Sequence, residues 1–100
     1  MVSFKDNQPA KIDAIAAVNE AERIIQSSNS LPSEERENAT NSLSSWGELI
    51  NKTSSFAVGA FKFMVWDRIK AVVESAIEEA YKTTLIGLLI TLGTIIVNLL

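Results

Sequence analysis

The sequence predicts an all-α protein in which two short amphipathic helices are followed by a long C-terminal helix that ends in a single transmembrane segment. Two observations lead to this fold class. Apolar residues recur at intervals of three and four along much of the chain, which is the period of one helical face. The last eighteen residues, 83–100, contain no charged side chain and no proline. We therefore expect a helical head at 1–55, an amphipathic linking helix at 56–82 and a transmembrane helix at 83–100.

The first helix is expected from about Pro9 to Gln26. Its apolar stripe contains Val18 and Ile25 but is otherwise rich in alanine, and charged residues fill the opposite face. An alanine-rich stripe lets a partner come close but buries little area, so this helix needs a neighbour to be stable.

The second helix is expected from about Ser33 to Ile50, after a turn rich in serine. Ser33 is a suitable N-cap, and nearby glutamates place negative charge where a helix N-terminus favours it. Leu43, Trp46 and Ile50 recur on one face of this helix. Trp46 is the largest side chain of that stripe, so we expect it to anchor the packing of the head.

The segment from Phe56 to Trp66 is strongly apolar and is interrupted only by Lys62. Its aromatic side chains, including Phe61 and Trp66, fit two interpretations: a core against which the first two helices fold, or a patch in the headgroup layer of a membrane. We favour the core, since the narrow stripes of the first two helices need something to cover them.

From Asp67 the pattern becomes amphipathic, and only Gly87 and Gly93 interrupt the helical sequence between Ala60 and Leu100. Glycine weakens a helix but does not end it. We therefore expect one continuous helix over this range, which passes from the aqueous phase into the membrane.

The transmembrane segment at 83–100 is about 27 Å long as a helix, which is short but sufficient for a hydrocarbon core of about 30 Å. Tyr81 and Lys82 precede it, and an aromatic ring and a long ammonium side chain both suit the headgroup layer. We expect these two residues to be the interface anchors, with Lys82 also forming an i,i+4 pair with Glu78.

The basic residues of the second half all precede the apolar segment, and they are Lys62, Arg68, Lys70 and Lys82. Positive charge tends to stay on the cytoplasmic side of a membrane. We therefore expect a single-pass, tail-anchored protein with its N-terminal head in the cytoplasm.

Small and polar residues of the apolar segment lie along one side of the helix, and they are Thr84, Gly87, Thr91, Thr94 and Asn98. Three interpretations compete. Threonine and glycine are simply tolerated there, or they form the seam of a helical oligomer, or they line a pore. We favour the seam, which is compatible with a pore because a ring of helices needs both. A separate alternative buries the whole segment inside a soluble assembly.

The composition leaves little room for catalysis. The chain contains no cysteine and no histidine, so it has no thiol nucleophile, no imidazole base and no usual zinc ligand. Neither half is basic enough to suggest nucleic acid. We expect no enzyme activity and no cofactor, and we interpret Glu74, Glu78 and Glu79 as a solvated face rather than a metal site.

These observations favour a small membrane protein that self-assembles into a homo-oligomer and acts on the lipid bilayer, as a channel, a pore-forming effector or a toxin-like protein. The first alternative is a tail-anchored adaptor or accessory subunit that binds a protein partner through its head and conducts nothing. The second is a soluble helical assembly that buries the C-terminal helix.

Overall fold

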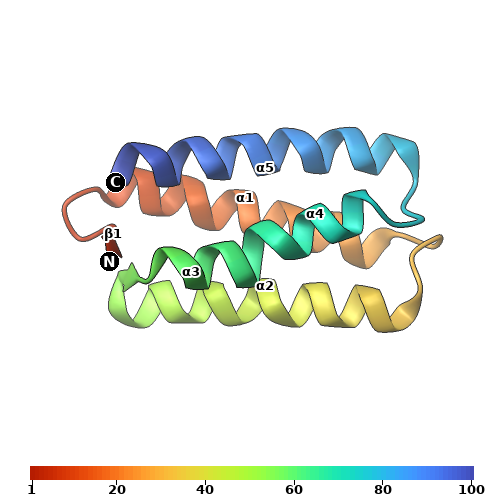
Figure 1. Ribbon diagram of the computed structural model, residues 1–100, viewed down its shortest axis with the longest axis horizontal. Helices are drawn as coiled ribbons and strands as arrows, with labels where there is room; N and C mark the ends of the chain where they lie inside the picture. The colour runs from red at the N-terminus through yellow and green to blue at the C-terminus, as the bar shows by residue number, and fades with distance from the viewer.

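The computed structural model describes residues 1–100 as an antiparallel four-helix bundle, about 40 × 21 × 19 Å in extent (Figure 1). This confirms the all-α class. The third helix of the bundle is built from three consecutive segments. The helical elements are α1 (Gln8–Ser27), α2 (Ser33–Thr53), α3 (Val58–Phe61), the π-helical η1 (Lys62–Trp66), α4 (Asp67–Val73) and α5 (Glu79–Leu99).

The ends of α1 and α2 follow from local sequence. Asn7 caps α1, because its Oδ1 accepts a hydrogen bond from the backbone N–H of Ala10 at 3.2 Å. α2 begins after Pro32 and carries Glu34 and Glu35 in its first turn. It ends at Thr53, and Ser54, the residue that follows, has a left-handed backbone with φ of 54°.

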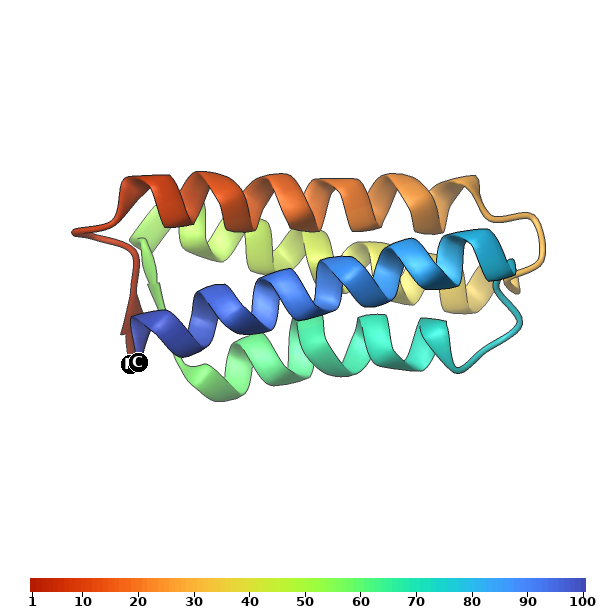
Figure 2. The same ribbon diagram turned by 90° about the horizontal axis from the view of Figure 1, so that it is seen from above.

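A two-stranded antiparallel pair closes one end of the bundle. β1 (Val2–Ser3) pairs with β2 (Ser55–Phe56), and Val2 lies opposite Phe56. Behind this pair lies a cluster of buried aromatic rings, with centroids 5.3 to 5.6 Å apart between Trp46 and Phe56, Phe4 and Phe56, and Trp46 and Phe61. Both termini lie at this end (Figure 2).

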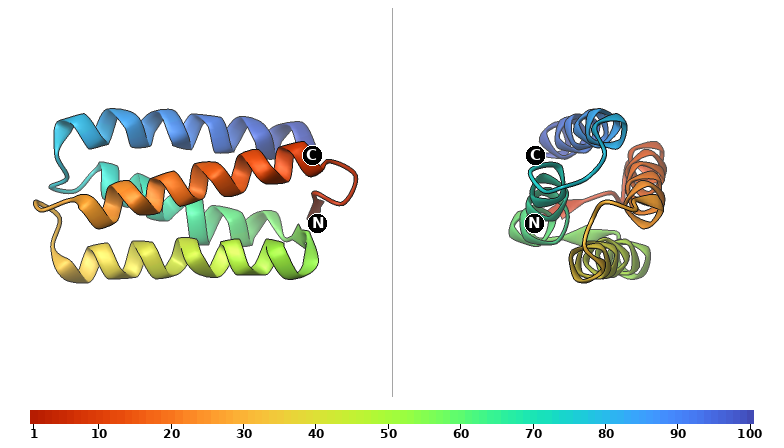
Figure 3. Two further views of the ribbon diagram at one scale, coloured as in Figure 1. Left: turned by 180° about the vertical axis from the view of Figure 1, so that it is seen from behind. Right: turned by 90° about the vertical axis from the view of Figure 1, so that its right-hand side faces the viewer.

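Helix α5 packs against α1 and α4 and lies diagonally across the bundle from α2, as the end-on view shows (Figure 3). The core contains 23 buried hydrophobic residues in one cluster. Helix α5 contributes Leu85, Leu89, Leu92 and Ile96, which recur at intervals of four, three and four. α5 is thus long and apolar, and it covers one side of the bundle with a narrow stripe.

The prediction of one continuous helix from Ala60 to Leu100 is wrong. The chain leaves the helix at Glu74, reverses direction, and begins α5 at Glu79. Two tertiary contacts favour the turn over a straight helix. Ile77 is buried in the core, and the carboxylate of Glu78 accepts hydrogen bonds from the turn between α1 and α2.

The expected ion pair between Glu78 and Lys82 does not form, because Glu78 precedes the helix and faces the other turn. Lys82 instead pairs with Glu79 at 3.3 Å. The segment expected at 56–82 as a linking helix therefore contains β2, a helix with a π turn, and the reversal that leads into α5.

Candidate functional site: helix α5 and its seat on the bundle

Helix α5 is long and apolar enough to cross a membrane, with a mean hydropathy of 1.7 over its most apolar window. Only 17% of that window is buried. The central helix of a soluble protein passes the same test of length and composition, but it is mostly buried. Most of the apolar surface of α5 therefore lies on the outside of the bundle, where Ile86, Ile90 and Val97 are exposed.

The predicted stripe of small and polar residues lies on this outer face. All five members are exposed, namely Thr84, Gly87, Thr91, Thr94 and Asn98. Each threonine hydroxyl of the stripe donates to the carbonyl four residues earlier, at 2.9 to 3.2 Å, and the accepting residues are Ala80, Gly87 and Ile90. These hydroxyl protons are already bonded within the helix. From residue 83 onward, the outer face of α5 presents no charge and no unpaired threonine donor.

No hydrogen bond or ion pair joins α5 to any other element. The side-chain hydrogen bonds and the ion pair of α5 all lie within the helix or its first turn. The helix is held on α1, on the third helix and on β1 by apolar contacts alone. Breaking a polar contact is costly mainly because it leaves a buried donor or acceptor without a partner. Separating α5 from the bundle would leave no such group.

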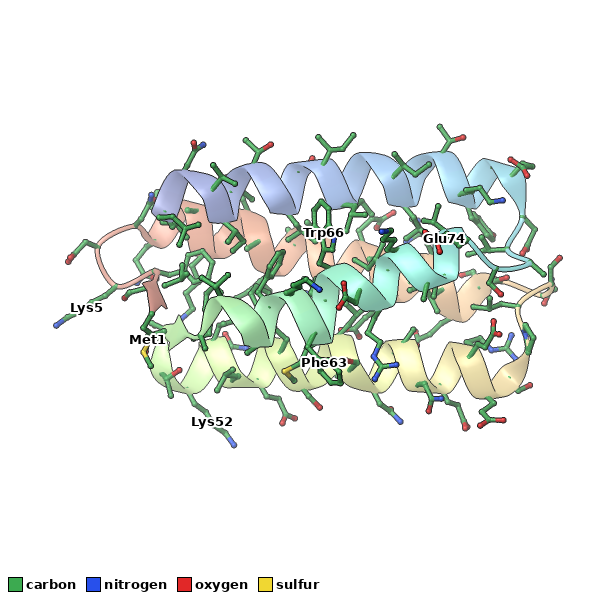
Figure 4. The ribbon with its side chains drawn as sticks, in the orientation of Figure 1. Met1, Lys5, Lys52, Phe63, Trp66 and Glu74 are labelled. Carbon is green, nitrogen blue, oxygen red and sulfur yellow. The ribbon has the colours of Figure 1, made fainter.

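Trp66 packs closely against Gly93 and so joins α5 to the third helix. A Cβ atom placed on Gly93 would lie 2.8 Å from Cζ3 of Trp66, so a side chain other than hydrogen has no room there. Trp66 is half-buried and lies between the two helices (Figure 4). Beside it runs an open, largely apolar groove of about 590 Å³, to which α3, η1 and α5 contribute side chains such as Val58 and Val97.

Glu78 fastens the turn that leads into α5. Its carboxylate accepts hydrogen bonds from the Ser28 hydroxyl at 2.5 Å and from the backbone N–H groups of Asn29 and Ser30 at 3.3 and 3.4 Å. Ser28 is fully buried. The bond from the Ser28 hydroxyl, reinforced by the backbone donors, lowers the pKa of Glu78 from 4.5 to about 2. A second link, from the Ser75 hydroxyl to Glu35 at 2.6 Å, holds the same turn to α2.

The remaining residues singled out from the sequence lie in two places. Tyr81 and Lys82, the expected interface anchors, are half-buried in the first turns of α5. Most of the residues expected to pack the head are buried in the core, namely Val18, Ile25, Leu43, Trp46, Ile50 and Phe61, whereas Trp66 is half-buried against α5.

Three residues with structural roles here have no signal, or a misleading one, in the sequence. Phe4 lies in a short N-terminal segment without periodicity, and nothing in the sequence marked it as buried. Glu78, which the sequence pattern places on a solvated face, instead bonds to the turn between α1 and α2. Gly93 weakens a helix by sequence alone, but a glycine within an otherwise bulky apolar run also indicates close approach by another group, which here is Trp66.

The structure holds no group of three or more acidic side chains that could bind a metal ion. Comparison of the chain with protein-family models, with curated proteins and with solved structures gives no match. The geometry of α5 and of its contacts with the bundle is therefore what bears on function.

Proposed function

We propose that the protein is a small membrane-active helical protein in which α5 leaves the bundle, crosses a lipid bilayer once, and assembles with α5 of other copies, while α1 to α4 remain as a head on the cytoplasmic side. One observation carries this proposal. The apolar helix α5 is mostly exposed and is fixed to the bundle by no polar bond.

The energetics of release support the proposal. The backbone of α5 is hydrogen-bonded within the helix, as a membrane span requires. Its four core residues would exchange one apolar environment for another. The exposed Ile86, Ile90 and Val97 would leave water, at a gain of roughly 25 cal/mol for each Å² of apolar surface. The gain on the outer face therefore helps to offset the contacts that α5 gives up.

The head keeps a core of its own when α5 is removed. The aromatic cluster is formed by Phe4, Trp46, Phe56 and Phe61, which come from the N-terminal segment, α2, β2 and α3. The packing of α1 against α2 also does not involve α5. A head of this kind can remain folded beside the membrane after α5 has inserted.

The stripe on α5 supports assembly because its small side chains allow two helices to come close. The threonine hydroxyls, however, already bond within their own helix, which is the specific observation that favours a second candidate function. In that alternative α5 is a simple anchor, and the head binds a protein partner. Replacing α5 by an unrelated apolar helix should then leave the function intact.

A disulfide that locks α5 onto α1 tests the release step, and the chain has no cysteine of its own to interfere. Ala17→Cys with Leu88→Cys joins the two helices across the groove that both residues line. As a matched control, Ser3→Cys with Ser55→Cys joins β1 to β2, which pair directly, and leaves α5 free.

Both pairs are oxidised, the cross-link is verified by mass, and resistance to carbonate extraction and dye leakage from vesicles are measured. We expect the α1–α5 disulfide to abolish carbonate-resistant membrane binding and dye leakage until it is reduced. The β1–β2 disulfide should leave membrane binding and leakage unchanged. Equal activity of the locked and reduced α1–α5 variants would contradict release of α5. Recovery of the unlocked chain only in the soluble fraction would contradict the membrane function altogether.

A further inference from the structure

The connection between α4 and α5 has a sequence that suits a helix. Residues 74–78 contain no glycine and no proline, and Glu74, Ala76 and Glu78 are of the types that favour helices most. The elements on both sides, α4 and α5, are helical. The turn at 74–78 therefore departs from the conformation that its own residues prefer.

Tertiary contacts within the chain hold this turn. Ile77 is buried in the core, and Glu78 accepts a hydrogen bond from the Ser28 hydroxyl. The Ser75 hydroxyl donates to Glu35 at 2.6 Å. All of these contacts are made by the turn itself, and all of them are lost if the segment straightens.

The backbone of the turn favours the opposite change. The N–H groups of Ala76 and Ile77 donate no backbone hydrogen bond in the bundle. In a helix through this segment they would donate to the carbonyls of Val72 and Val73, four residues earlier. New backbone hydrogen bonds would therefore offset part of the loss of the tertiary contacts.

A straight connection would carry α5 away from its own bundle. The turn lies at the end opposite the strands, and α5 runs back from it antiparallel to α4 (Figure 1). A helix through 74–78 would place Leu99 about 39 Å beyond Val73 along the axis of α4. In that form α5 cannot reach the surface that it covers on its own α1 and third helix, which we call the seat of α5.

The partner that fits an empty seat is α5 of a second copy. Gly93 leaves the room that Trp66 fills, so the seat and α5 are complementary in shape. Because these contacts are apolar, they can form equally well between two chains. The directions also agree: when two straightened copies meet at their turn ends about a two-fold axis, each α5 runs antiparallel to the α4 of the other copy.

The straight helix would also have an apolar stripe where the two copies meet. Val73, Ala76, Ile77 and Ala80 lie at helical spacing across the former turn. In the bundle, Ala76 and Ala80 are exposed. Two straight helices that cross at these side chains would bury them, and the small alanines allow a close approach.

We propose that two copies of the chain exchange α5 to form a two-fold symmetric dimer in water, in which residues 74–78 are helical and each α5 occupies the seat of the other copy. Exchange of an identical element is a low-cost route to a dimer, because it reuses the contacts of the single chain. The exchange needs no membrane, so it stands or falls separately from the proposed function.

The charges near the turn predict how salt affects the dimer. Residues 74–82 contain three glutamates and one lysine. Two copies that meet at this end therefore repel each other, and salt screens repulsion between exposed charges. We expect the dimer fraction to rise with ionic strength.

Proline at position 79 separates the bundle from the straight form. Glu79 is the first residue of α5, and Glu78 before it has an extended backbone with ψ of 141°, so proline fits the bundle. Within a continuous helix, the same proline would clash with the carbonyl of Ser75 and remove a hydrogen bond. Glu79→Ala is the matched control, because it also removes the carboxylate of Glu79 but is compatible with both forms.

The chains are unfolded in urea, refolded at high protein concentration in salt without lipid or detergent, and sized by native mass. We expect the wild type and Glu79→Ala to form the dimer beside the monomer. Glu79→Pro should form at least about tenfold less dimer, because each dimer would contain two helices interrupted by proline. Circular dichroism verifies that the proline variant folds.

A disulfide between chains identifies the element that is exchanged. A chain with Ala17→Cys is refolded together with a chain with Leu88→Cys, and the dimer is oxidised and analysed by mass after unfolding. We expect a mixed disulfide, because the two residues line one groove between α1 and α5. Ser3→Cys mixed with Ser55→Cys is the control and should give none, since β1 and β2 pair within each chain.

Three results would overturn the exchange. The wild-type chain stays monomeric at every concentration and salt, or the dimer persists in Glu79→Pro, or the dimer lacks the mixed disulfide between positions 17 and 88. The last result would mean that intact bundles associate side by side. Insertion of α5 into a bilayer is measured separately, by carbonate extraction and dye leakage, and none of these results bears on it.

Discussion

At the scale of single residues, Glu78 joins two turns of the bundle that are fifty residues apart in sequence. Its carboxylate occupies the position that an acceptor must fill if Ser28 is to remain buried with its hydroxyl bonded. It therefore fixes where the chain reverses before α5. The direction of α5 thus depends on contacts made by the turn before it, with Glu78 among them, rather than on the apolar sequence that follows.

Glu78→Gln should make the stability of the bundle less dependent on pH. The folded pKa of about 2 lies below the ordinary 4.5, so the carboxylate stabilises the fold above pH 4.5, and this contribution is lost as the pH falls toward 2. Urea unfolding of both chains across this range measures the difference. We expect the variant to be less stable at pH 7 and to converge with the wild type near pH 2.

Glu74→Gln serves as the control for this experiment, because Glu74 is exposed and its carboxylate forms no hydrogen bond. Its stability should follow the wild-type curve. A constant difference between wild type and Glu78→Gln from pH 7 to pH 2 would show that the ionised carboxylate contributes nothing specific.

The two glycines of α5 should respond in opposite ways to replacement by alanine. Gly93→Ala forces a Cβ atom into Trp66, and such overpacking costs about 1 to 3 kcal/mol. Gly87→Ala meets nothing within 4 Å and should stabilise the helix by up to about 1 kcal/mol. Urea unfolding in the absence of lipid compares the two. Equal stabilities would mean that Trp66 does not pack on α5 in solution.

At the scale of elements, α5 presents two different faces. Leucine and isoleucine side chains are buried against α1 and α4, while the uncharged outer face carries the stripe. The stripe therefore plays no part in the fold of a single chain. Changes to it should affect what α5 meets outside the bundle and leave the bundle itself intact.

Thr91→Leu combined with Thr94→Leu should preserve membrane insertion and weaken assembly. Leucine is at least as favourable as threonine in a bilayer, but its larger side chain keeps neighbouring helices apart. We expect the oligomer of this variant to dissociate in detergent at a protein concentration about tenfold higher than the wild-type oligomer does, as measured by native mass. Ile86→Leu with Ile90→Leu, outside the stripe, is the control. Unchanged assembly and leakage in the threonine variant would exclude the stripe as the seam.

The regular apolar stripes of α1 and α2 predict both helices to within three residues of their observed ends. The expected N-cap at Ser33 is wrong, because α2 begins after Pro32 without a side-chain capping bond. The turn at 74–78 could not be predicted in the same way. Its neighbours in sequence are good helix formers, and the contact that bends the chain comes from Ser28, far away in sequence. The contact between Trp66 and Gly93 likewise depends on the reversal of the chain at 74–78, which no local sequence pattern predicts.

At the scale of the whole molecule, the bundle divides into a head with polar and aromatic links and one helix attached by apolar contacts alone. Such a helix can open as a unit without unfolding the rest. The opened state would expose the buried residues of α5, namely Leu85, Leu89, Leu92 and Ile96, and is therefore sparsely populated in water. A bilayer would stabilise the opened state, because these side chains could then contact lipid instead of water.

Hydrogen exchange of the soluble protein should detect this opening. We expect backbone amides in α5 to exchange faster than those at the centres of α1 and α2, since α5 opens at a lower free energy than global unfolding. Mass spectrometry of peptides from 79–99, 8–27 and 33–53 measures the rates. As a control, Lys70→Glu changes an exposed residue of α4, so its α5 amides should exchange at the wild-type rate. A single common rate for all three regions would show that α5 is an inseparable part of the cooperative fold.

The π turn η1 bears on how the length of this chain can change. A π turn holds about one residue more than a turn of α-helix, so it accommodates an extra residue without rotating the helix on either side. Phe63, within η1, is 63% exposed and contributes nothing to the core. A chain lacking this residue could close a regular helical turn and keep both Phe61 and Ile69 inside. Within the third helix, we therefore expect a single-residue deletion to be tolerated best at η1.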